Sequence, residues 1–238
     1  MRRAEKVTLQ LQAVSILRRL KATRTYEELA DLTGLSAGDL NRYVNGHVLP
    51  GIDRARHIVE AYGPETLAAE IESRIERDED GYVDNTDVVF DQSLLDLVAT
   101  VAAEVHDFGD PDAVLTAATD GITLAGAFAR HFDVPAVYAK KSRETAVSSF
   151  LEARQRLTPG IEITYSLPES ALDAGENVLV VDDFVRSGDT QQLLLDLASQ
   201  AGVTVTGVFT LIAVGEAGID SVRAAVDAPV RAFTSLPE

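Results

Sequence analysis

Two adjacent carboxylates, Asp182 and Asp183, directly follow an uninterrupted aliphatic run at 178–181. Such a run predicts a buried parallel strand, and open α/β sheets bind ligands at the carboxyl ends of their strands. A loop containing Gly188 comes next, and Thr190 can act as the N-cap of the helix that follows. Such a junction presents unpaired backbone N–H groups and a positive dipole end to an anion. The stretch therefore predicts a phosphate site flanked by two acids, which suits a sugar phosphate whose hydroxyl groups need acceptors.

Three other interpretations compete for this stretch. Acid pairs also hold magnesium in receiver domains, but these place the pair near the start of a fold of about one hundred residues or more. Too little chain follows Asp183 for that fold. A Walker-B strand is the second, but the chain contains no G-x-x-x-x-G-K-[ST] motif. In the third, the acids merely solvate the sheet edge. We favour the sugar-phosphate interpretation.

Two further loops carry groups that suit anions. The loop 119–121 follows a predicted strand at 114–117, and Gly121 allows a close approach of the backbone to an anion. Lys140 and Lys141 follow the next predicted strand and make up half of the lysines in the chain. The alternative for this pair is a solvated charged turn. We favour anion binding, because the lysines lie side by side in an otherwise acidic region.

The first third of the chain predicts short helices. Helical apolar spacing predicts one over 7–20, a capping box a second over 25–32, and an N-capping serine a third over 37–44. Gly34 supplies the turn between the second and third. An Asn-Gly pair ends the third helix, and a fourth is expected over 53–61.

This spacing resembles the helix-turn-helix of phage-repressor-like DNA-binding domains. Residues 1–75 carry 11 Lys and Arg against 10 Asp and Glu, whereas residues 76–238 carry 10 against 28. A region that faces nucleic-acid phosphates needs such relief from acid. The alternative is a helical bundle used for dimerisation. The resemblance turns the following side chains toward DNA: Ser36, Ala37, Asp39, Asn41, Arg42 and Asn45.

Composition and net charge limit the classes of protein to which the chain can belong. A net charge of −17 over 238 residues resembles that of proteins from salt-loaded cytoplasm. No apolar run approaches the roughly 18 residues that span a bilayer, and no signal-peptide core follows the N-terminus, so we expect a cytoplasmic protein. The lack of cysteine excludes disulfides and thiolate metal sites, and the four histidines lack metal-site spacing. We expect no resident metal site.

We expect a helix-turn-helix DNA-binding domain over 1–77, a linker over 78–90 and an effector domain over 91–238. The acids at 77–85 match an EF-hand calcium loop incompletely, so a solvated linker is favoured. The effector domain alternates predicted helices and strands, which argues for a mainly parallel sheet. The predicted helices cover 94–105, 123–131 and 191–199, and the strands cover 114–117, 134–138, 178–181 and 208–213.

Together the three loops resemble those of type I phosphoribosyltransferases, whose shared ligand is phosphoribosyl pyrophosphate. The resemblance implies an α/β fold with a mainly parallel sheet, joined here to an N-terminal all-α helix-turn-helix domain. It implies that the acid pair accepts ribose hydroxyls and that loop 186–190 holds the 5′-phosphate. Loop 119–121 would hold the pyrophosphate with magnesium, and the lysine pair would reach phosphates in the same subunit or a dimer partner. The ligand-binding residues so implied are Asp182, Asp183, Arg186, Ser187, Gly188, Asp189, Thr190, Thr119, Asp120, Gly121, Lys140 and Lys141.

The whole architecture resembles the haloarchaeal orotate phosphoribosyltransferase-like transcriptional regulators, the GfcR family, assigned to central sugar catabolism. Phe184, after the acids, resembles xanthine phosphoribosyltransferases and the bacterial purine repressor, which also joins a DNA-binding domain to this fold. The resemblance implies a homodimer that binds double-stranded DNA and senses phosphoribosyl pyrophosphate or a related phosphosugar.

Three departures from the family pattern bear on catalysis. Asp120 stands where many relatives have a basic residue, and Arg186 and Asp189 replace small or hydroxyl residues of the phosphate loop. No residue can be named as a general acid or base. We therefore expect a regulator rather than an enzyme. The alternatives are an active phosphoribosyltransferase of the orotate or purine type with an accessory N-terminal domain, and a structural adaptor that binds no ligand.

Overall fold

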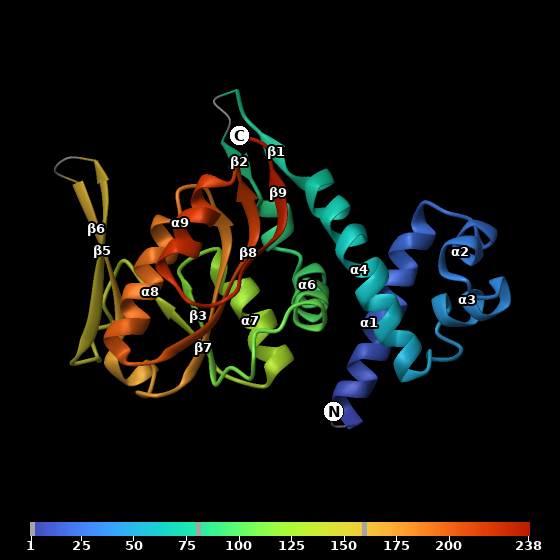
Figure 1. The fold of residues 1–238 in the computed structure, drawn as a ribbon, viewed down its shortest axis with the longest axis horizontal. Helices are drawn as coiled ribbons and strands as arrows, with labels where there is room; N and C mark the ends of the chain where they lie inside the picture. Colours follow the sequence, from blue (N-terminus) through green and yellow to red (C-terminus); the bar gives the residue numbers. More distant parts are fainter. Residues whose placement is uncertain (1–2, 80–81, 159–160) are drawn as a thin grey trace. The chain divides into compact units, whose positions relative to one another are not determined.

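The computed structural model describes residues 3–79, 82–158 and 161–238 (Figure 1). The chain divides into two compact units, and each is described by itself. The first comprises Met1–Ser73 with Thr100–His106, and the second comprises Arg74–Ala99 with Asp107–Glu238. No helix in the described ranges is both long and apolar enough to cross a membrane.

The first unit is helical. Its main helices are α1 (Arg3–Ala22), α2 (Tyr26–Thr33), α3 (Ala37–Val44) and α4 (Ile52–Arg74). Leu17, Leu29, Leu40 and Ile58, one from each helix, are fully buried and form its core. Burial of one apolar stripe per helix accounts for the amphipathic spacing in the sequence.

Local capping fixes the starts of the two short helices as predicted. The Glu28 amide donates to Thr25 Oγ1 over 3.2 Å, and the Thr25 amide donates to Glu28 Oε2 over 2.7 Å, which completes the capping box of α2. Gly34 ends α2 with a φ of 66°, and Ser36 Oγ accepts the Asp39 amide at the start of α3.

The prediction of a short fourth helix over 53–61 is wrong, because α4 continues through Pro64 to Arg74. Proline removes one helical hydrogen bond, but packing around Gly63 favours continuation. A Cβ atom on Gly63 would lie 2.6 Å from the side chain of Val101, so the helix is closely packed there. This tertiary packing outweighs the local signal of the Gly-Pro pair.

The second unit is built on a five-stranded parallel sheet with the order β4-β3-β7-β8-β9 (Figure 1). The strands are β3 (Ala113–Ala117), β4 (Ala136–Ala139), β7 (Asn177–Val185), β8 (Thr204–Val214) and β9 (Val230–Leu236). The helices are α6 (Gln92–Val105, whose last turns belong to the first unit), α7 (Gly121–Phe132), α8 (Asp189–Ala201) and α9 (Ala217–Ala225). This architecture confirms the predicted α/β fold with a mainly parallel sheet.

Helices cover both faces of this sheet (Figure 1). Leucines of α8 and apolar residues of α9 pack in one cluster with Leu115 and Val180 of the central strands. On α7, Phe128 lies with its ring centroid 4.8 Å from that of Phe209 on β8. Full burial on both faces explains why the central strands are continuous apolar runs.

The sequence did not predict a long antiparallel hairpin, β5 (Phe150–Thr158) and β6 (Ile161–Pro168). Lys140 and Ser166 exchange two backbone hydrogen bonds of 3.0 and 2.7 Å, which attach β6 beside the end of β4. A signal for β6 was present in the sequence, because Ile161, Ile163, Tyr165 and Leu167 alternate with polar residues, but the prediction did not use it. Strand β9 and helix α9 were also not predicted.

Part of the range over which a linker is predicted, 78–90, contains regular structure among its described residues. Strands β1 (Glu76–Arg77) and β2 (Val83–Asp84) pair as a short hairpin, and α5 (Thr86–Val89) follows. Val88 and Val89 are buried, so the segment packs against the second unit instead of crossing solvent. The two adjacent valines were the signal for this packing, and the acids before them obscured it.

Candidate functional site

The carboxyl ends of the central strands surround an open cleft of about 700 Å³. This volume is typical of small-molecule sites. The cleft is lined by Ala117, Ala118, Thr119, Asp120, Lys140, Lys141, Ser142, Tyr165, Asp182, Asp183, Phe184 and Thr190. The structure thus brings side chains from all three predicted loops to one cleft. Gly121, Arg186, Ser187, Gly188 and Asp189 lie in the same loops but outside this lining.

Asp182 is a buried carboxyl on β7, which continues beyond it to Val185, and 5% of its surface is exposed. Gln191 of α8 donates to its Oδ2 over 2.7 Å, and the Asp183 amide donates to its Oδ1 over 3.1 Å. Burial, reinforced by the negative charges of Asp183 and Asp120, raises the pKa of Asp182 well above its usual range. The two hydrogen bonds therefore fix the Asp182 side chain in place. Another negative charge near this carboxyl would be unfavourable unless a positive charge compensated it.

Asp183 is partly buried, and its Oδ2 accepts a hydrogen bond of 2.7 Å from Asn85 Nδ2. Burial raises the pKa of Asp183, and Asp120 acts in the same direction, whereas the Asn85 hydrogen bond opposes the rise. Asn85 and Gln191 are the polar partners that the sequence reasoning missed. Asn85 lies 98 residues from Asp183, and no spacing signal connects them.

The loop 119–121 leads from β3 into α7, and the peptide bond between Ala118 and Thr119 is cis. Thr119 and Asp120 are exposed, and Asp120 directly precedes the helix. A side chain on Gly121 would collide with Thr116 Oγ1 and come within 3.0 Å of Asp182 Oδ1. Glycine is therefore required here for close packing of α7 against the acid-bearing strand, a role that the sequence prediction of anion access did not include.

The prediction that Thr190 caps α8 is wrong. Helix α8 begins at Asp189, and Gly188 occupies the N-cap with a φ of 85°. A glycine that adopts this left-handed conformation and an acid in the first helical turn both favour the earlier start. Thr190 consequently lies in the first turn of α8, where it lines the cleft.

Two glycines hold this loop against the start of α9. A Cβ atom on Gly188 would lie 2.8 Å from the carbonyl oxygen of Gly218, and one on Gly218 would lie 2.5 Å from that of Arg186. Ser187 Oγ also donates to Asp189 Oδ2 over 2.8 Å. The loop that precedes α8 is therefore tightly packed, with the first N–H groups of α8 at its end.

The two lysines have different surroundings. Lys140 forms an ion pair with Glu144, and this hydrogen bond raises the pKa of Lys140. Its Nζ also lies 5.0 Å from the centroid of the Tyr138 ring. Lys141 Nζ lies 5.5 Å from the centroid of the Tyr165 ring. An incoming phosphate must therefore compete with Glu144 for Lys140.

Magnesium accompanies phosphoribosyl pyrophosphate in the reaction that the family resemblance implies. Among the described residues, no group of three or more His, Cys, Asp or Glu side chains is arranged to hold a metal ion. The residues of the cleft do not fit a resident metal centre, so any magnesium here would depend on oxygen ligands of the bound phosphosugar.

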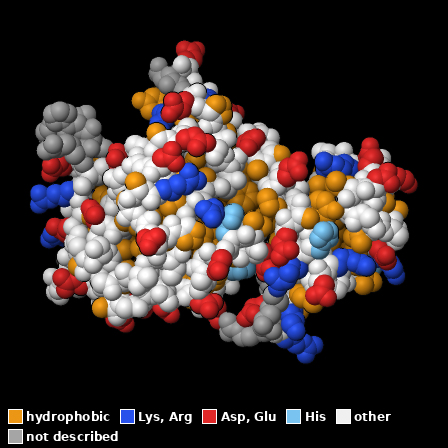
Figure 2. All heavy atoms as spheres, in the orientation of Figure 1, with side chains coloured by type: hydrophobic (Ala, Val, Ile, Leu, Met, Phe, Trp, Pro, Cys, Tyr) orange, Lys and Arg blue, Asp and Glu red, His pale blue; other side chains and the backbone are white. Residues whose placement is uncertain are grey.

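In the first unit, the predicted DNA-contacting residues lie on α3 and its two ends. Ser36, Asn41, Arg42 and Asn45 are exposed, and Ala37 and Asp39 are partly buried. Arg42 forms an ion pair with Asp39, and Asn45 Nδ2 donates to the carbonyl oxygen of Asn41 over 2.9 Å. Side chains of both charge signs lie among these helices on the face drawn in Figure 2.

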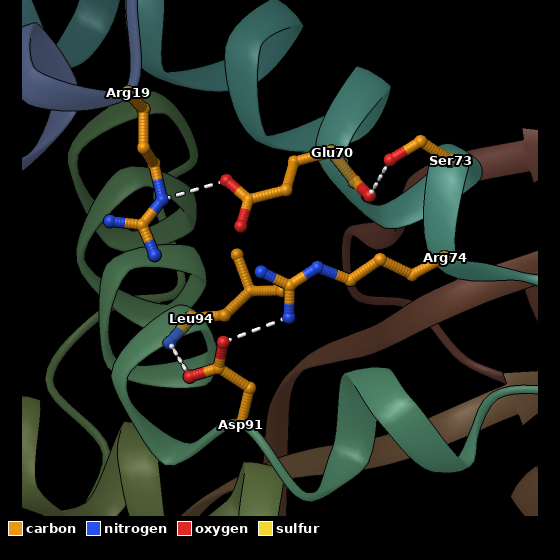
Figure 3. Close-up of polar contacts among 6 residues, drawn as sticks. All are labelled: Arg19, Glu70, Ser73, Arg74, Asp91 and Leu94. Atoms are coloured by element: carbon orange, nitrogen blue, oxygen red, sulfur yellow. Dashed lines mark hydrogen bonds and ion pairs between the residues drawn. The ribbon is translucent and has the colours of Figure 1, made fainter. Parts of the chain in front are cut away.

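An ion pair joins α1 to α4 in this unit. Arg19 Nε of α1 donates to Glu70 Oε2 of α4 over 2.7 Å, and Ser73 Oγ donates to the carbonyl oxygen of Glu70 over 2.8 Å (Figure 3). These contacts engage Arg19 within its own unit.

Two curated relatives match part of the chain. It is 32% identical over 133 residues to the purine biosynthesis transcriptional repressor PurR of Bacillus subtilis, which covers 56% of this chain and 47% of that protein. It is 35% identical over 109 residues to the xanthine phosphoribosyltransferase of Clostridium tetani, covering 42% and 54%. The chain thus spans about half the length of these two relatives.

A longer sequence match and a structural match also point to phosphoribosyltransferases. Identity to the xanthine phosphoribosyltransferase of Lacticaseibacillus casei is 31% over 153 residues, which covers 60% of this chain and 79% of that enzyme. Adenine phosphoribosyltransferase from Thermoanaerobacter pseudethanolicus superposes with a TM-score of 0.62 at 18% identity, covering 71% of this chain and 99% of that one. This structural match shows a shared fold.

The phosphoribosyl transferase domain family matches residues 85–229, which is more than half of the chain. This segment contains the strands β3, β4, β7 and β8 and every residue that lines the cleft. The chain belongs to the phosphoribosyl transferase domain family.

Proposed function

We propose that this protein is a DNA-binding transcriptional regulator of the haloarchaeal GfcR type, whose effector is phosphoribosyl pyrophosphate or a related phosphosugar. The observation that carries the proposal is the combination, in one chain, of the acid-lined cleft with a helical unit that presents polar side chains on α3. One relative, from Bacillus subtilis, is a purine biosynthesis transcriptional repressor. By analogy with the GfcR family, the regulated genes belong to central sugar metabolism.

The effector would bind through three parts of the cleft. Asp182 and Asp183 would accept ribose hydroxyls, because ionised carboxylates offer about four acceptor positions each. The loop 186–190 and the first turn of α8 would hold the 5′-phosphate through backbone N–H groups. The loop 119–121 would face the pyrophosphate, and Lys141 would offer a positive charge to it.

DNA would be bound by the region 1–77, with α3 in the major groove. Asn41 and Arg42 have the side chains that read base edges, and Ser36 suits a phosphate. Arg42 would exchange its ion pair with Asp39 for a DNA contact. A homodimer would place two such helices on two half-sites, while residues 91–238 form the effector domain. The excess of acid in that domain suits a salt-rich cytoplasm, and high salt reduces the contribution of counterion release, so direct contacts would carry more of the affinity.

An active phosphoribosyltransferase is the second candidate, because xanthine phosphoribosyltransferases are among the relatives. In that case Mg²⁺ with phosphoribosyl pyrophosphate would be the substrate, and a nucleobase the acceptor. Base-dependent release of pyrophosphate, lost in Asp182→Ala, would favour this candidate. The acid at position 120, beside the expected pyrophosphate, argues for binding without turnover.

The testing experiment is calorimetric titration of phosphoribosyl pyrophosphate with magnesium in concentrated potassium chloride. Wild type and Asp183→Ala are compared, followed by gel-shift measurements on promoter fragments with and without the same compound. The proposal predicts binding that the substitution abolishes, and a change in DNA affinity on addition of the compound. Because linkage is reciprocal, DNA must change the affinity for the compound by the same factor. Equal affinities with and without DNA would refute the regulator.

A further inference from the structure

Asn85 occupies an unusual position for a helix-capping residue. It stands at the N-cap of α5, yet its side chain makes no capping hydrogen bond to that helix. Asp84 provides the local contact instead, because its Oδ1 accepts the Thr86 amide over 2.9 Å. The Asn85 amide group donates to Asp183 Oδ2, 98 residues away, over 2.7 Å. Asparagine at an N-cap normally bonds to the helix that it starts, so this side chain is committed to the cleft.

This contact fixes a carboxylate in unfavourable surroundings. Burial disfavours ionisation of Asp183 and raises its pKa, and the negative charge of Asp120 acts in the same direction. Asn85 is a neutral donor that stabilises the ionised form without adding a competing charge. It occupies one of the roughly four acceptor positions of this carboxylate, and Asp183 itself lines the cleft where a ligand hydroxyl would bind.

The same residue lies in the segment that follows the N-terminal helices along the chain. Arg74, at the end of α4, bonds to Asp91 over 2.8 Å, and Asp91 Oδ1 accepts the Leu94 amide over 3.0 Å (Figure 3). Between these ends, Arg77 bonds to the carbonyl oxygen of Pro237, and Val88 and Val89 are buried. The segment is thus held at several points, one of which is an acid of the cleft.

We propose that Asn85 is a positioning residue of the phosphosugar cleft, which orients Asp183 for ligand hydroxyls and links the occupancy of the cleft to the order of segment 82–90. The inference rests on the proposed phosphosugar binding and adds that binding is coupled to the order of segment 82–90. A ligand that needs Asp183 ionised and oriented strengthens the Asn85 contact, and by reciprocity the contact strengthens ligand binding by the same factor. Segment 82–90 is therefore better ordered when the ligand is bound.

The test compares Asn85→Ala with Asp87→Ala in the full-length protein. Asp87 is exposed on the same short helix, so its replacement perturbs the segment without touching Asp183. Asn85→Ser serves as a second variant, because serine retains the preference for an N-cap but is too short for the contact. The measurements are calorimetric titration with magnesium phosphoribosyl pyrophosphate across pH, and amide hydrogen exchange of peptides covering 82–90.

We expect about tenfold weaker binding in both Asn85 variants, since loss of one hydrogen bond to a charged group has about that effect. The acid limb of the binding profile should move to higher pH, because Asp183 loses the partner that favours its ionised form. Asp182, Asp120, Lys140 and Lys141 also face the cleft, and they are unchanged in these variants. Protection of 82–90 by the ligand should be present in wild type and Asp87→Ala and absent in both Asn85 variants.

The possible results distinguish a failure of the positioning role of Asn85 from a failure of phosphosugar binding itself. If wild type binds the compound and the Asn85 variants bind equally well with the same pH profile, the positioning role is overturned and the phosphosugar site stands. Loss of ligand-dependent protection with unchanged affinity would likewise overturn the positioning role. If folded wild type does not bind at all, the sensor itself fails, and the role of Asn85 fails with it.

Discussion

Gln191 Nε2 lies 2.7 Å from Asp182 Oδ2 and 3.0 Å from the carbonyl oxygen of Phe184. One buried amide group on α8 thus satisfies both a cleft carboxyl and the backbone of β7. This contact joins the first turn of α8, next to the expected phosphate position, to the acid that would bind a sugar hydroxyl.

Replacing Gln191 by leucine keeps the approximate volume and removes both hydrogen bonds. A buried carboxyl oxygen and a partly buried carbonyl oxygen then lose this donor, which we expect to lower the free energy of unfolding by about 1–3 kcal/mol. The matched control is Gln200→Leu on the exposed end of the same helix, whose amide bonds to the carbonyl oxygen of Glu152. Denaturant unfolding in potassium chloride measures the free energy of unfolding of both variants. Equal effects of the two substitutions would contradict a special role for Gln191.

The raised pKa of Asp182 predicts a direction for the pH dependence of stability. Burial raises the pKa in the folded state, so between the ordinary aspartate value and the raised value the folded state binds more protons than the unfolded state. This contribution to stability is therefore present at acid pH and is lost as the pH rises through the folded-state pKa. Asp182→Asn should flatten that decline.

The measurement is the free energy of unfolding at a series of pH values in constant salt. Asp189→Asn serves as the control, because Asp189 is exposed and its replacement removes the same charge. A decline that is equally steep in wild type and Asp182→Asn would show that other groups cause it.

Gly188 tests how far the loop before α8 depends on glycine. Alanine there meets both a φ of 85° and the Gly218 carbonyl oxygen at 2.8 Å, so we expect a loss of about 2–4 kcal/mol in stability together with weaker phosphate binding. Gly175 has a φ of 90° with no neighbouring atom within 4 Å of its would-be Cβ. Gly175→Ala therefore measures the backbone cost alone, about 1 kcal/mol. Similar losses would mean that the packing against α9 contributes little.

Asp120 should determine which phosphosugars the cleft accepts. Its carboxylate lines the cleft at the loop expected to face pyrophosphate, so Asp120→Asn should raise the affinity for phosphoribosyl pyrophosphate by about three- to tenfold. The affinity for ribose 5-phosphate should change less, because that compound carries no phosphate at this end. Asp196 is exposed on α8 and does not line the cleft, so Asp196→Asn controls for the change in net charge. If Asp120→Asn raised the affinity for both compounds equally, Asp120 would not act by repelling the pyrophosphate group.

Strong local signals in the sequence predicted four strands of the parallel sheet, β3, β4, β7 and β8, and the helices α6, α7 and α8. The aliphatic run before the acids fixed β7, because only burial on both faces tolerates such a run. Because the carboxyl ends of parallel strands meet at one edge of the sheet, the sequence also predicted that Asp120, Lys140 and Asp182 lie in one cleft. Asn85 and Gln191 could not be predicted as partners of the acids, since each depends on the three-dimensional path of the chain. The alternating apolar residues of β6 were a usable signal that the prediction missed. The extension of α4 past Pro64 depends on packing of Gly63 that no local pattern reveals.

Arg42 offers the sharpest test of the helical unit. If α3 reads DNA, Arg42→Ala should weaken binding to a promoter fragment by about tenfold, because a good base or phosphate contact contributes about 1–3 kcal/mol. Arg223→Ala is the matched control, because Arg223 also pairs with an aspartate three residues earlier on an exposed helix surface. Titration with phosphoribosyl pyrophosphate should be unchanged in both variants. If Arg42→Ala retains full DNA affinity while Asn41→Ala does the same, α3 does not enter the groove, and the helical unit serves another purpose such as dimerisation.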